Sequence, residues 1–513
     1  MRSATLVLAV LAMGAALANA TTFQLSTKTP YVPADVSSNY AAPPAGCSDE
    51  FTSMFIRHGA RYPTSNDNKK QAKLTQASGG SISAAQQATI AANGFAWLQG
   101  WVPPYDIRYQ GDLVTAGMTE QYDMAKRLKV SFPNSFANTL YTPEAYAFAS
   151  ANVPRVIQSS AAFSYGLFEG SGPMHGGYMP VQVTTQDPQD DVTIAFKDNC
   201  PLWGSSVDGN ASAILEYTAF TNTKLAPVIA KIKAKLNSPT DAGYNPSSAD
   251  VQAMYAACSS EYSINGIANQ WCSLFDDDDF TTMQYWDDLD NWYLYAYPTV
   301  GYQQAANLLQ AMVRDITTHI ATPSMTRASV RHGHAEGIIP YTQLLRLYRE
   351  SAPLTANADA TTIANRKFHG DKIVPYSANI AMVLYTCSSG DKYIKLLHNE
   401  KEVAVPDCAH PVNTFYCPVA DFQATYATEL ALNFATVCQV PVVPATVTAT
   451  VTQTSTQTQT QTLTSTQTQT QTQTQTQTET VTVTGHHNAG VTAQVGTGLL
   501  AMTLVAALVA AAF

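Results

Sequence analysis

An apolar run at residues 51–56, FTSMFI, ends directly at a charged residue, Arg57, and this junction constrains the fold more than any other feature of the chain. The run does not alternate strictly between polar and apolar residues, which is typical of a strand buried on both faces of a parallel sheet. Parallel sheets of this kind belong to α/β proteins, which bind ligands where the carboxyl ends of the strands enter loops. We therefore predict an α/β fold with a ligand site at the loop that begins at Arg57.

This loop, RHGARYP, places Arg57, His58 and Arg61 within one short turn. Two guanidinium groups three or four residues apart can both contact one tetrahedral dianion, because the planar fork of arginine matches paired phosphate oxygens. An imidazole between them can attack phosphorus. Gly59 lets the backbone come close to a ligand, and Pro63 stiffens the end of the loop. The loop thus indicates phosphoryl chemistry with His58 as the candidate nucleophile.

Longer elements support the α/β assignment. The spacing of apolar residues predicts helices at 115–132, 301–320 and 338–350. The segment ANIAMVLYTC at 378–387 is long enough for a helix, but its last residues are typical of a buried strand, so both remain possible. The stretch from about 200 to 310 is mostly helical and aromatic in pattern, and we interpret it as a cap inserted into the core.

Several segments resemble one known family. RHGARYPT is similar to the RHGxRxP signature of the histidine acid phosphatases, in the phosphoglycerate mutase-like superfamily, and VPRVIQSSAAFSYGLF resembles the family segment that supplies a third phosphate-binding arginine, Arg155. GHAE at 333–336 resembles the second motif of the multiple inositol polyphosphate phosphatase branch, where most other branches have His-Asp. VPYSANIAMVLYTC and HNEKEVAVPDC also resemble that branch. The resemblance covers roughly residues 47–440 and implies a phosphoglycerate mutase-like core with a helical cap.

The resemblance also implies roles for individual residues. His58 attacks phosphorus, and Arg57, Arg61, Arg155 and His334 bind the phosphate oxygens. Glu336 protonates the leaving alkoxide and then acts as base when water hydrolyses the phosphohistidine. We expect a bound phosphate and partial burial to raise the pKa of Glu336, which predicts an acidic to near-neutral optimum. No metal or other cofactor is required.

The chain departs from the family pattern at three positions. Ala60 stands where Thr is common, His332 where an aromatic residue is usual, and Gly337 where Thr is usual. None of these changes removes a catalytic group. We therefore interpret Arg331-His332-Gly333 as an incidental second copy of the Arg-His-Gly tripeptide, and the second motif as beginning at His334.

Other interpretations of these segments remain open. His332, His334 and Glu336 alternate and could form a zinc site on one face of a strand. The acidic run at 275–280 could bind calcium, but it lacks the spacing and central glycine of an EF-hand loop, which favours an exposed helix start. The aromatic segment at 285–298 is a sugar-binding face or, as we predict, core of the cap.

Three lysines follow the first motif, and they either contact further phosphates of the substrate or are exposed loop residues: Lys69, Lys70 and Lys73. The 513-residue chain has a net charge of −10 and no long basic run, which disfavours nucleic acid as a partner. The predicted substrates are small-molecule phosphate esters, inositol polyphosphates including phytate. A broad-specificity acid phosphatase and a non-catalytic surface display protein are the alternatives.

The first twenty residues are typical of a secretory signal peptide cleaved after Ala20, so we predict the secretory pathway and an oxidising compartment for the eight cysteines. Spacing alone does not select a pairing. The resemblance implies four disulfides: Cys47–Cys387, Cys200–Cys438, Cys258–Cys272 and Cys408–Cys417. Asn210 begins a glycosylation sequon in a stretch typical of exposed loops.

The C-terminal region differs in composition from the folded domain, which we assign to residues 21–440. Residues 441–488 are rich in Thr and Gln and lack large apolar residues, which predicts a disordered stalk. Residues 489–513 combine a polar spacer with a short apolar tail, as in a glycosylphosphatidylinositol signal that is removed when lipid is attached, here at Asn488. A retained tail anchor is the alternative. We therefore expect a protein at the cell surface.

Overall fold

The structure, a computed structural model, describes residues 23–34, 40–75, 80–136, 140–208, 210–237, 243–322, 325–441, 448–463 and 467–482. The chain forms two compact units, Met1–Val440 and Pro441–Phe513, which are described separately. The predicted signal peptide, Asn488 and the predicted C-terminal lipid signal lie outside the described residues. Within the described part, no helix combines the length and the apolar character needed to cross a membrane.

A mixed sheet forms the centre of the first unit, and eight strands belong to it among the described residues, in the order β3-β2-β4-β1-β5-β6-β7 with β8 paired to β6. The strands are β1 (Cys47–Arg57), β2 (Tyr146–Ser150), β3 (Val183–Thr185), β4 (Ala328–Gly333), β5 (Asn379–Cys387), β6 (Lys392–His398), β7 (Lys401–Val403) and β8 (Tyr416–Pro418). The α/β assignment is thus confirmed.

The predicted buried strand is the central strand β1, in which every residue from Phe51 to Arg57 is buried. It pairs in parallel with β4 on one side and antiparallel with β5 on the other. The ambiguous segment at 378–387 is therefore a strand and not a helix. Its residues are buried almost throughout, as expected for a strand between two neighbours.

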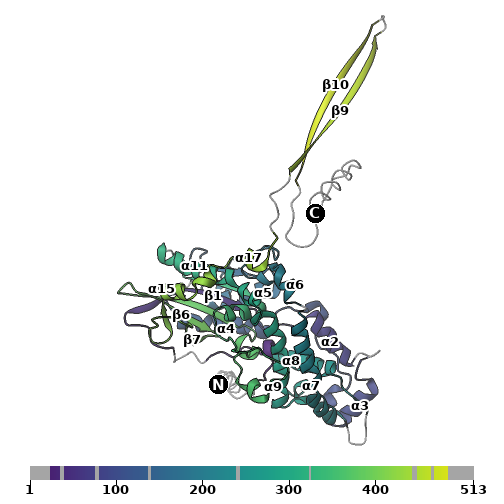
Figure 1. Ribbon diagram of the computed structural model, residues 1–513, viewed down its shortest axis with the longest axis vertical. Coiled ribbons are helices and arrows are strands. Elements are labelled where there is room, and N and C mark those ends of the chain that lie inside the picture. The colour runs from purple at the N-terminus through teal and green to yellow at the C-terminus, as the bar shows by residue number, and fades with distance from the viewer. Residues whose placement is uncertain are drawn as a thin grey trace. The chain divides into compact units, whose positions relative to one another are not determined.

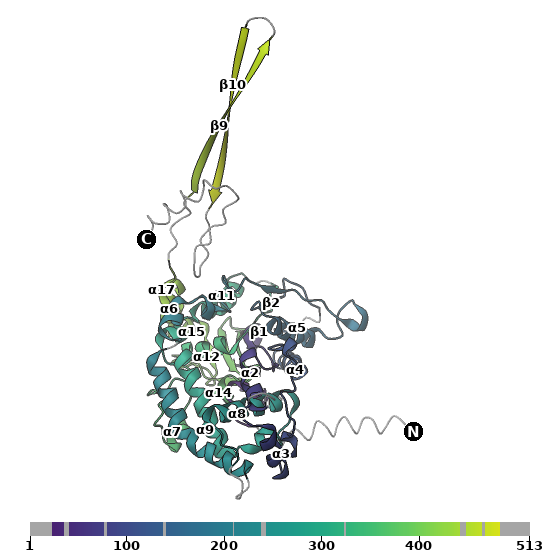
Figure 2. The same cartoon turned by 90° about the vertical axis from the view of Figure 1, so that its right-hand side faces the viewer.

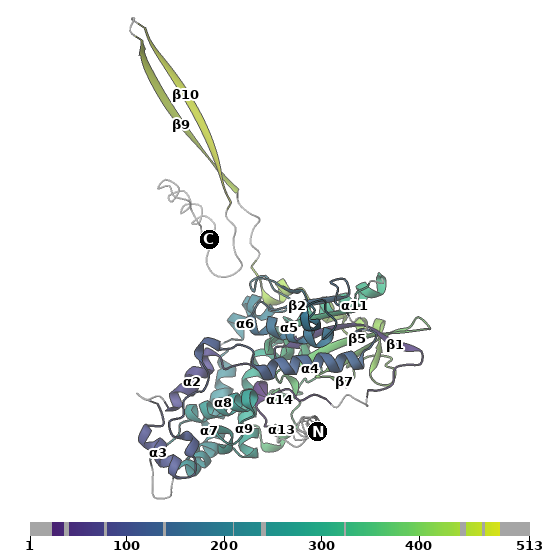
Figure 3. The same cartoon turned by 180° about the vertical axis from the view of Figure 1, so that it is seen from behind.

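Helices cover both faces of the sheet. The described helices are α2 (Ser65–Thr75), α3 (Ala84–Ala92), α4 (Thr115–Ser131), α5 (Pro154–Phe168), α6 (Pro201–Ser206), α7 (Ala211–Leu236), α8 (Ser248–Asn265), α9 (Asp277–Asn291), α10 (Thr299–Gln303), α11 (Ala306–Ala321), α12 (Ala335–Leu344), α13 (Ala360–Asn365), α14 (Gly370–Ile373), α15 (Val419–Thr425), α16 (Ala427–Leu430) and α17 (Phe434–Cys438). Helices α4 and α5 pack their apolar residues on one face, and α11 and α12 cover the other (Figures 1 and 3).

The helical cap lies beside this layered core. Helices α7, α8 and α9 fall within the range predicted for the cap and lie side by side in Figure 2. The earlier helix α2 joins them, because the Gln71 amide donates to the Ala256 carbonyl and to the Ser260 hydroxyl of α8. The cap is thus assembled from two separate stretches of the chain.

Two predicted helices differ in the structure. The helix predicted at 301–320 is two helices, α10 and α11, and the side-chain amide of Gln304 at the break donates to the Gly301 carbonyl. The helix predicted at 338–350 ends at Leu344, since Arg346 has a positive φ of 63° that a right-handed helix cannot accommodate. The helix predicted at 115–132 is present as α4.

The structure forms the four disulfides implied by the resemblance: Cys47–Cys387, Cys200–Cys438, Cys258–Cys272 and Cys408–Cys417. Cys47 and Cys387 stand opposite each other in the β1–β5 ladder, so this bridge ties the start of the central strand to its neighbour. The strand that ends at Arg57 is therefore held covalently at its far end.

The second unit differs from the expected disordered stalk. Two antiparallel strands, β9 (Thr448–Leu463) and β10 (Gln467–Thr482), pair over their whole length, with Thr opposite Thr and Gln opposite Gln through most of the register (Figure 1). The prediction of disorder rested on the missing apolar residues. Threonine has a high β-propensity, which favours extended backbone and accounts for strands without large apolar residues.

His332, on β4, is an ionisable group in an apolar environment. It is fully buried, its ring meets Phe163 edge-on at a centroid distance of 5.6 Å, and neither ring nitrogen has a hydrogen-bond partner within the described ranges. Burial lowers the pKa of His332 to about 3. Its neighbour Arg331 is occupied elsewhere, in an ion pair with Asp315 at 2.7 Å. The second Arg-His-Gly tripeptide is therefore part of the sheet.

We predict that His332→Phe stabilises the protein selectively in acid. Below a pH of 6.5 the unfolded chain protonates this imidazole, whereas the folded chain resists protonation down to about pH 3, so stability is lost as the pH falls through that window. The loss is about 1.4 kcal/mol per pH unit. Thermal unfolding at about pH 7.5 and about pH 4.5 should show a larger gain for the variant at the lower pH, by roughly 3 kcal/mol. An equal gain for His332→Phe at both pH values would contradict the assignment.

Candidate active site

The parallel pairing of β1 with β4 brings the two sequence motifs together. Their register ends with Arg57 opposite Gly333, and the His58 N–H then donates to the Gly333 carbonyl at 3.0 Å. His58 and His334, which leave the carboxyl ends of these adjacent strands, face each other with ring centroids 5.3 Å apart. Residues separated by more than 270 positions in the sequence thus share one site.

The orientation of His58 suits a nucleophile. Its Nδ1 lies 2.9 Å from the carbonyl oxygen of Gly59, an acceptor, so Nδ1 carries the proton and Nε2 keeps its lone pair. Burial and the nearby positive charges of Arg57 and other cations lower the pKa of His58 well below its ordinary value. The imidazole therefore stays neutral, as attack on phosphorus requires.

The loop after His58 is held by helix α4, by contacts that the sequence analysis did not anticipate. A Cβ on Gly59 would lie 2.3 Å from the Gly117 carbonyl oxygen, so the two backbones touch where both residues lack a side chain. The N–H of Ala60 donates to the half-buried Glu120 carboxylate at 2.9 Å, and the Gln121 amide donates to the Arg57 carbonyl at 2.8 Å. Glu120 and Gln121 are thus positioning residues for the nucleophile loop.

Arg57 is fixed more firmly than a surface arginine. Its Nη1 donates to the carbonyls of Thr27 at 2.5 Å and Val374 at 2.7 Å, and the guanidinium lies 4.7 Å from the centre of the Tyr376 ring. Burial lowers the pKa of Arg57 to about 10, so it remains charged at physiological pH. These contacts leave Nη2 and the buried Nε without a partner among the described residues. Both nitrogens can therefore donate hydrogen bonds to an anion.

Arg61 and Arg155 complete the group of guanidiniums. Arg61 donates to the Tyr62 carbonyl at 2.9 Å and lies 3.9 Å from the Asp67 carboxylate. Arg155 is in the first turn of α5, after Pro154, and its buried Nε has no partner in the described part of the chain. Burial and the charge of Arg61 lower the pKa of Arg155, which shows that these cations lie close together.

His334 is the N-cap residue of α12. Its Nδ1 lies 3.4 Å from Nη2 of Arg155, which can only donate, so Nδ1 is the acceptor and Nε2 carries the proton. Burial is the main cause that lowers the pKa of His334 to about 4. At near-neutral pH His334 is therefore a neutral imidazole that can donate from Nε2 to an anion opposite His58.

Glu336 lies in the first turn of α12 and differs from expectation in its protonation. Burial alone would raise the pKa of its carboxyl. The neighbouring His334, a hydrogen bond from its own backbone N–H, and the charges of Lys197 and Arg57 together lower it below the ordinary value. The predicted rise is therefore wrong for the unliganded site. Glu336 is ionised there until an anion offsets these charges.

A cavity of about 200 Å³ opens beside these groups. Its lining includes Arg155, His334 and Glu336, and also Lys197 and Asp198. We call it the side cavity. Gly337 also borders it, and a Cβ at that position would lie 2.5 Å from the Phe55 ring. Phe55 of β1 thus explains why glycine replaces the usual threonine, since no side chain fits between helix and strand.

The other candidate sites have structural roles. No group of His, Cys, Asp and Glu suited to a metal is present among the described residues, and His332 is separated from the cavity within the sheet. In the acidic run, Asp276 caps α9 and binds Lys231 at 2.9 Å. The aromatic segment places Tyr285, Trp286, Trp292 and Tyr295 in the core of the cap. Asn210 is exposed at the start of α7, as expected for a glycosylation site.

The three lysines after the first motif all lie on α2 and are exposed: Lys69, Lys70 and Lys73. Among them, Lys70 is near enough to Asp290 of α9 to act on its carboxyl, although burial raises the pKa of Asp290 to about 6. A contact between these lysines and further phosphates stays a prediction.

Comparison with known proteins gives a consistent result. The model of the histidine phosphatase superfamily, branch 2, matches residues 50–399, a range that contains all six candidate residues. The chain is 29% identical to multiple inositol polyphosphate phosphatase 1 of Gallus gallus over 419 residues, which is 79% of this chain and 87% of the relative.

Solved structures share the fold. The phytase from D. castellii superposes with a TM-score of 0.66 at 18% identity, covering 81% of this chain and 87% of the phytase. A multiple inositol polyphosphate phosphatase from Bifidobacterium longum, in complex with inositol hexasulfate, superposes with a TM-score of 0.60 at 17% identity, covering 79% and 98% of the two chains.

Proposed function

Because this chain belongs to branch 2 of the histidine phosphatase superfamily, we propose that it hydrolyses phosphate monoesters of inositol polyphosphates, phytate included, through a phosphohistidine on His58. The observation that carries the proposal is the complementary protonation of the two facing imidazoles. His58 presents a lone pair on Nε2, and His334 presents a proton on Nε2, with Arg155 beside it. A phosphate between the two rings therefore has the nucleophile His58 on one face and the hydrogen-bond donors His334 and Arg155 on its other faces.

The first half of the reaction transfers the phosphoryl group to the enzyme. The Nε2 lone pair of His58 forms a bond to phosphorus while the bond to the ester oxygen breaks in line with it. Arg57, Arg61, Arg155 and His334 stabilise the charge on the three equatorial oxygens. Glu336, protonated when the phosphate binds, gives its proton to the departing inositol oxygen.

The second half restores the enzyme. Glu336, now a carboxylate, takes a proton from water, and the hydroxide formed attacks phosphorus as the bond to Nε2 breaks. Inorganic phosphate leaves, and the electron pair of the broken bond returns to Nε2 of His58, whose other nitrogen, Nδ1, keeps its proton and donates it to the Gly59 carbonyl throughout. The lowered pKa of Glu336 in the free site keeps it in the carboxylate form from which a base acts, and makes the acid role depend on the charge of the bound phosphate.

We predict that the full chain releases phosphate from phytate and from 4-nitrophenyl phosphate and that EDTA leaves both activities unchanged. His58→Ala should lower both rates by roughly 10³-fold or more, because no other group replaces the nucleophile. His332→Phe is the matched control and should retain activity. Release from the nitrophenyl ester alone would indicate a broad acid phosphatase. No release from either ester would indicate a display protein, and loss of activity in EDTA would contradict the metal-free mechanism.

We predict that Glu336→Gln affects the two esters differently. An inositol alkoxide needs a proton to leave, so hydrolysis of phytate should fall by about 10²- to 10⁴-fold. Nitrophenolate leaves without one, so the variant should release one equivalent of nitrophenolate per enzyme in a burst and then stall as the phosphohistidine. Rapid-mixing absorbance at about 400 nm would measure the burst. Slow release without a burst would contradict the assignment of Glu336 as acid and base.

We also propose that a lipid anchor holds the enzyme at the cell surface. The support is the signal-like first twenty residues, the disulfide-bonded cysteines and the apolar C-terminal tail. A mature chain that begins at Thr21 and is released from cells by a phosphatidylinositol-specific phospholipase is the expected result. A chain that stays cell-bound after this treatment and retains residues 489–513 by mass spectrometry would indicate a tail anchor instead.

A further inference from the structure

The side cavity continues beyond the catalytic groups to a lysine that has no role in the mechanism above. Lys197, on the short 3₁₀ helix η6 (Phe196–Asn199), lines this cavity together with Glu336 and Arg155. A water molecule occupies about 30 Å³, so a cavity of about 200 Å³ has room for a group of several heavy atoms. Because the leaving group must lie on the Glu336 side of the phosphate, this cavity receives part of the leaving group.

The ammonium group of Lys197 is free to exchange its present partner. Its side chain is 27% exposed and pairs with the Asp198 carboxylate at 2.9 Å, while Asp198 itself is 57% exposed. An ion pair that is open to solvent contributes little to stability, because water screens the attraction between its charges. A phosphate group in the cavity carries more charge than one carboxylate and offers three acceptor oxygens. It can therefore replace Asp198 at small cost.

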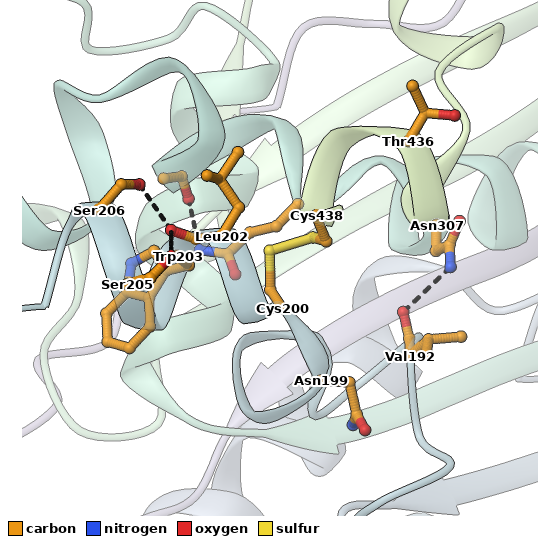
Figure 4. The surroundings of a disulfide bond; sticks show 12 residues. Val192, Asn199, Cys200, Leu202, Trp203, Ser205, Ser206, Asn307, Thr436 and Cys438 are labelled. Carbon is orange, nitrogen blue, oxygen red and sulfur yellow. Dashed lines mark hydrogen bonds between the residues drawn. A yellow bond between two sulfur atoms is a disulfide. The ribbon is translucent and has the colours of Figure 1, made fainter. Parts of the chain in front are cut away.

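The backbone that carries Lys197 is rigid. The Cys200–Cys438 disulfide ties the start of α6, immediately after η6, to α17 (Figure 4). The Lys197 Nζ lies 5.2 Å from the centre of the Trp203 ring. That ring stacks on Tyr295 and donates from Nε1 to the Leu294 carbonyl at 2.8 Å. The stacked rings of Trp203 and Tyr295 thus hold the lysine at the cavity, which reduces the entropy that its side chain loses when it binds an anion.

The field of Lys197 already reaches the catalytic groups. Its charge is one of those that lower the pKa of Glu336, and the carboxylate of Asp198 acts in turn on His334. Lys197 lines the cavity, so its ammonium group can contact a substituent that enters it next to the ester being cleaved. An anionic substituent there would be attracted by Lys197 and Arg155 together.

We infer that Lys197 binds a second phosphate of the substrate, on a ring carbon near the ester being cleaved, and so makes the site selective for polyphosphorylated leaving groups. This inference rests on the proposed function. It adds a specificity-determining residue on the leaving-group side. A monophosphate with an uncharged leaving group gains nothing from Lys197, whereas inositol hexakisphosphate always carries a neighbouring phosphate.

The test compares two substrates that share the inositol ring and differ in the other five phosphates, the neighbouring ones included: inositol hexakisphosphate and inositol monophosphate. In the full chain, Lys197→Met should lower the ratio of their kcat/KM values by about 10-fold or more, mainly through KM for the hexakisphosphate. The ratio cancels any effect of the lost charge on Glu336 that both substrates share. Lys197→Arg keeps the charge and should keep the ratio.

Two further variants separate Lys197 from its surroundings. Lys126 also pairs with an exposed acid, Glu169, and lies 5.3 Å from a tyrosine ring, so Lys126→Met is a matched control and should leave the ratio unchanged. The double variant Lys197→Met with Asp198→Asn should keep the low ratio. If it regains the wild-type ratio, repulsion by the unpaired Asp198 caused the loss and Lys197 is not a binding residue.

The outcomes distinguish this inference from the proposed function. A wild-type enzyme that prefers the hexakisphosphate, together with an unchanged ratio in Lys197→Met, overturns the role of Lys197 alone. A wild-type enzyme that hydrolyses only the monophosphate overturns the proposed function, and the inference with it. Added salt should lower the ratio in the wild type towards that of Lys197→Met, because salt screens the attraction between Lys197 and the second phosphate.

Discussion

The parallel pairing of β1 with β4 is the contact on which the rest of the site depends. It ends with Arg57 opposite Gly333, and the next hydrogen bond, from the His58 N–H to the Gly333 carbonyl, sets the nucleophile beside the second motif. A slip of one residue in this register would turn His58 to the other face of the sheet. Cys47–Cys387 restrains the opposite end of β1, and the close contact of Gly59 with Gly117 restrains the loop. The catalytic geometry is therefore a property of the sheet.

Unpaired positive charge in a buried place is the second constraint. Arg57 is buried and Arg155 is half-buried, and each has a buried Nε without a partner among the described residues. Both lower the pKa of His58, and Arg57 also lowers the pKa of Glu336. Such an arrangement costs stability in the free enzyme, and a phosphate dianion relieves it. In a chain with a net charge of −10, substrate attraction therefore comes from this local cluster, with Lys197 at its edge.

Sequence reasoning succeeded where a pattern was local. The buried strand before Arg57, the helix at 115–132 and the grouping of Arg57, His58 and Arg61 follow from neighbours in the chain. It failed where distant residues decide. The segment at 378–387 is a strand because β1 and β6 flank it, and the helix at 301–320 breaks at Gln304. Glu120 carries no signal in the sequence, since a glutamate in a helix is ordinarily exposed.

The sequence by itself determined which groups could act on a phosphate, because a loop after a buried strand with two arginines and a histidine has few other uses. Only the tertiary structure decided how those groups are protonated. The Gly59 carbonyl and the guanidinium of Arg155 select the tautomers of His58 and His334, and the charges around Glu336 set the direction of its pKa. Both effects fall steeply with distance and depend on burial, and neither distance nor burial is a property of a residue within its own segment.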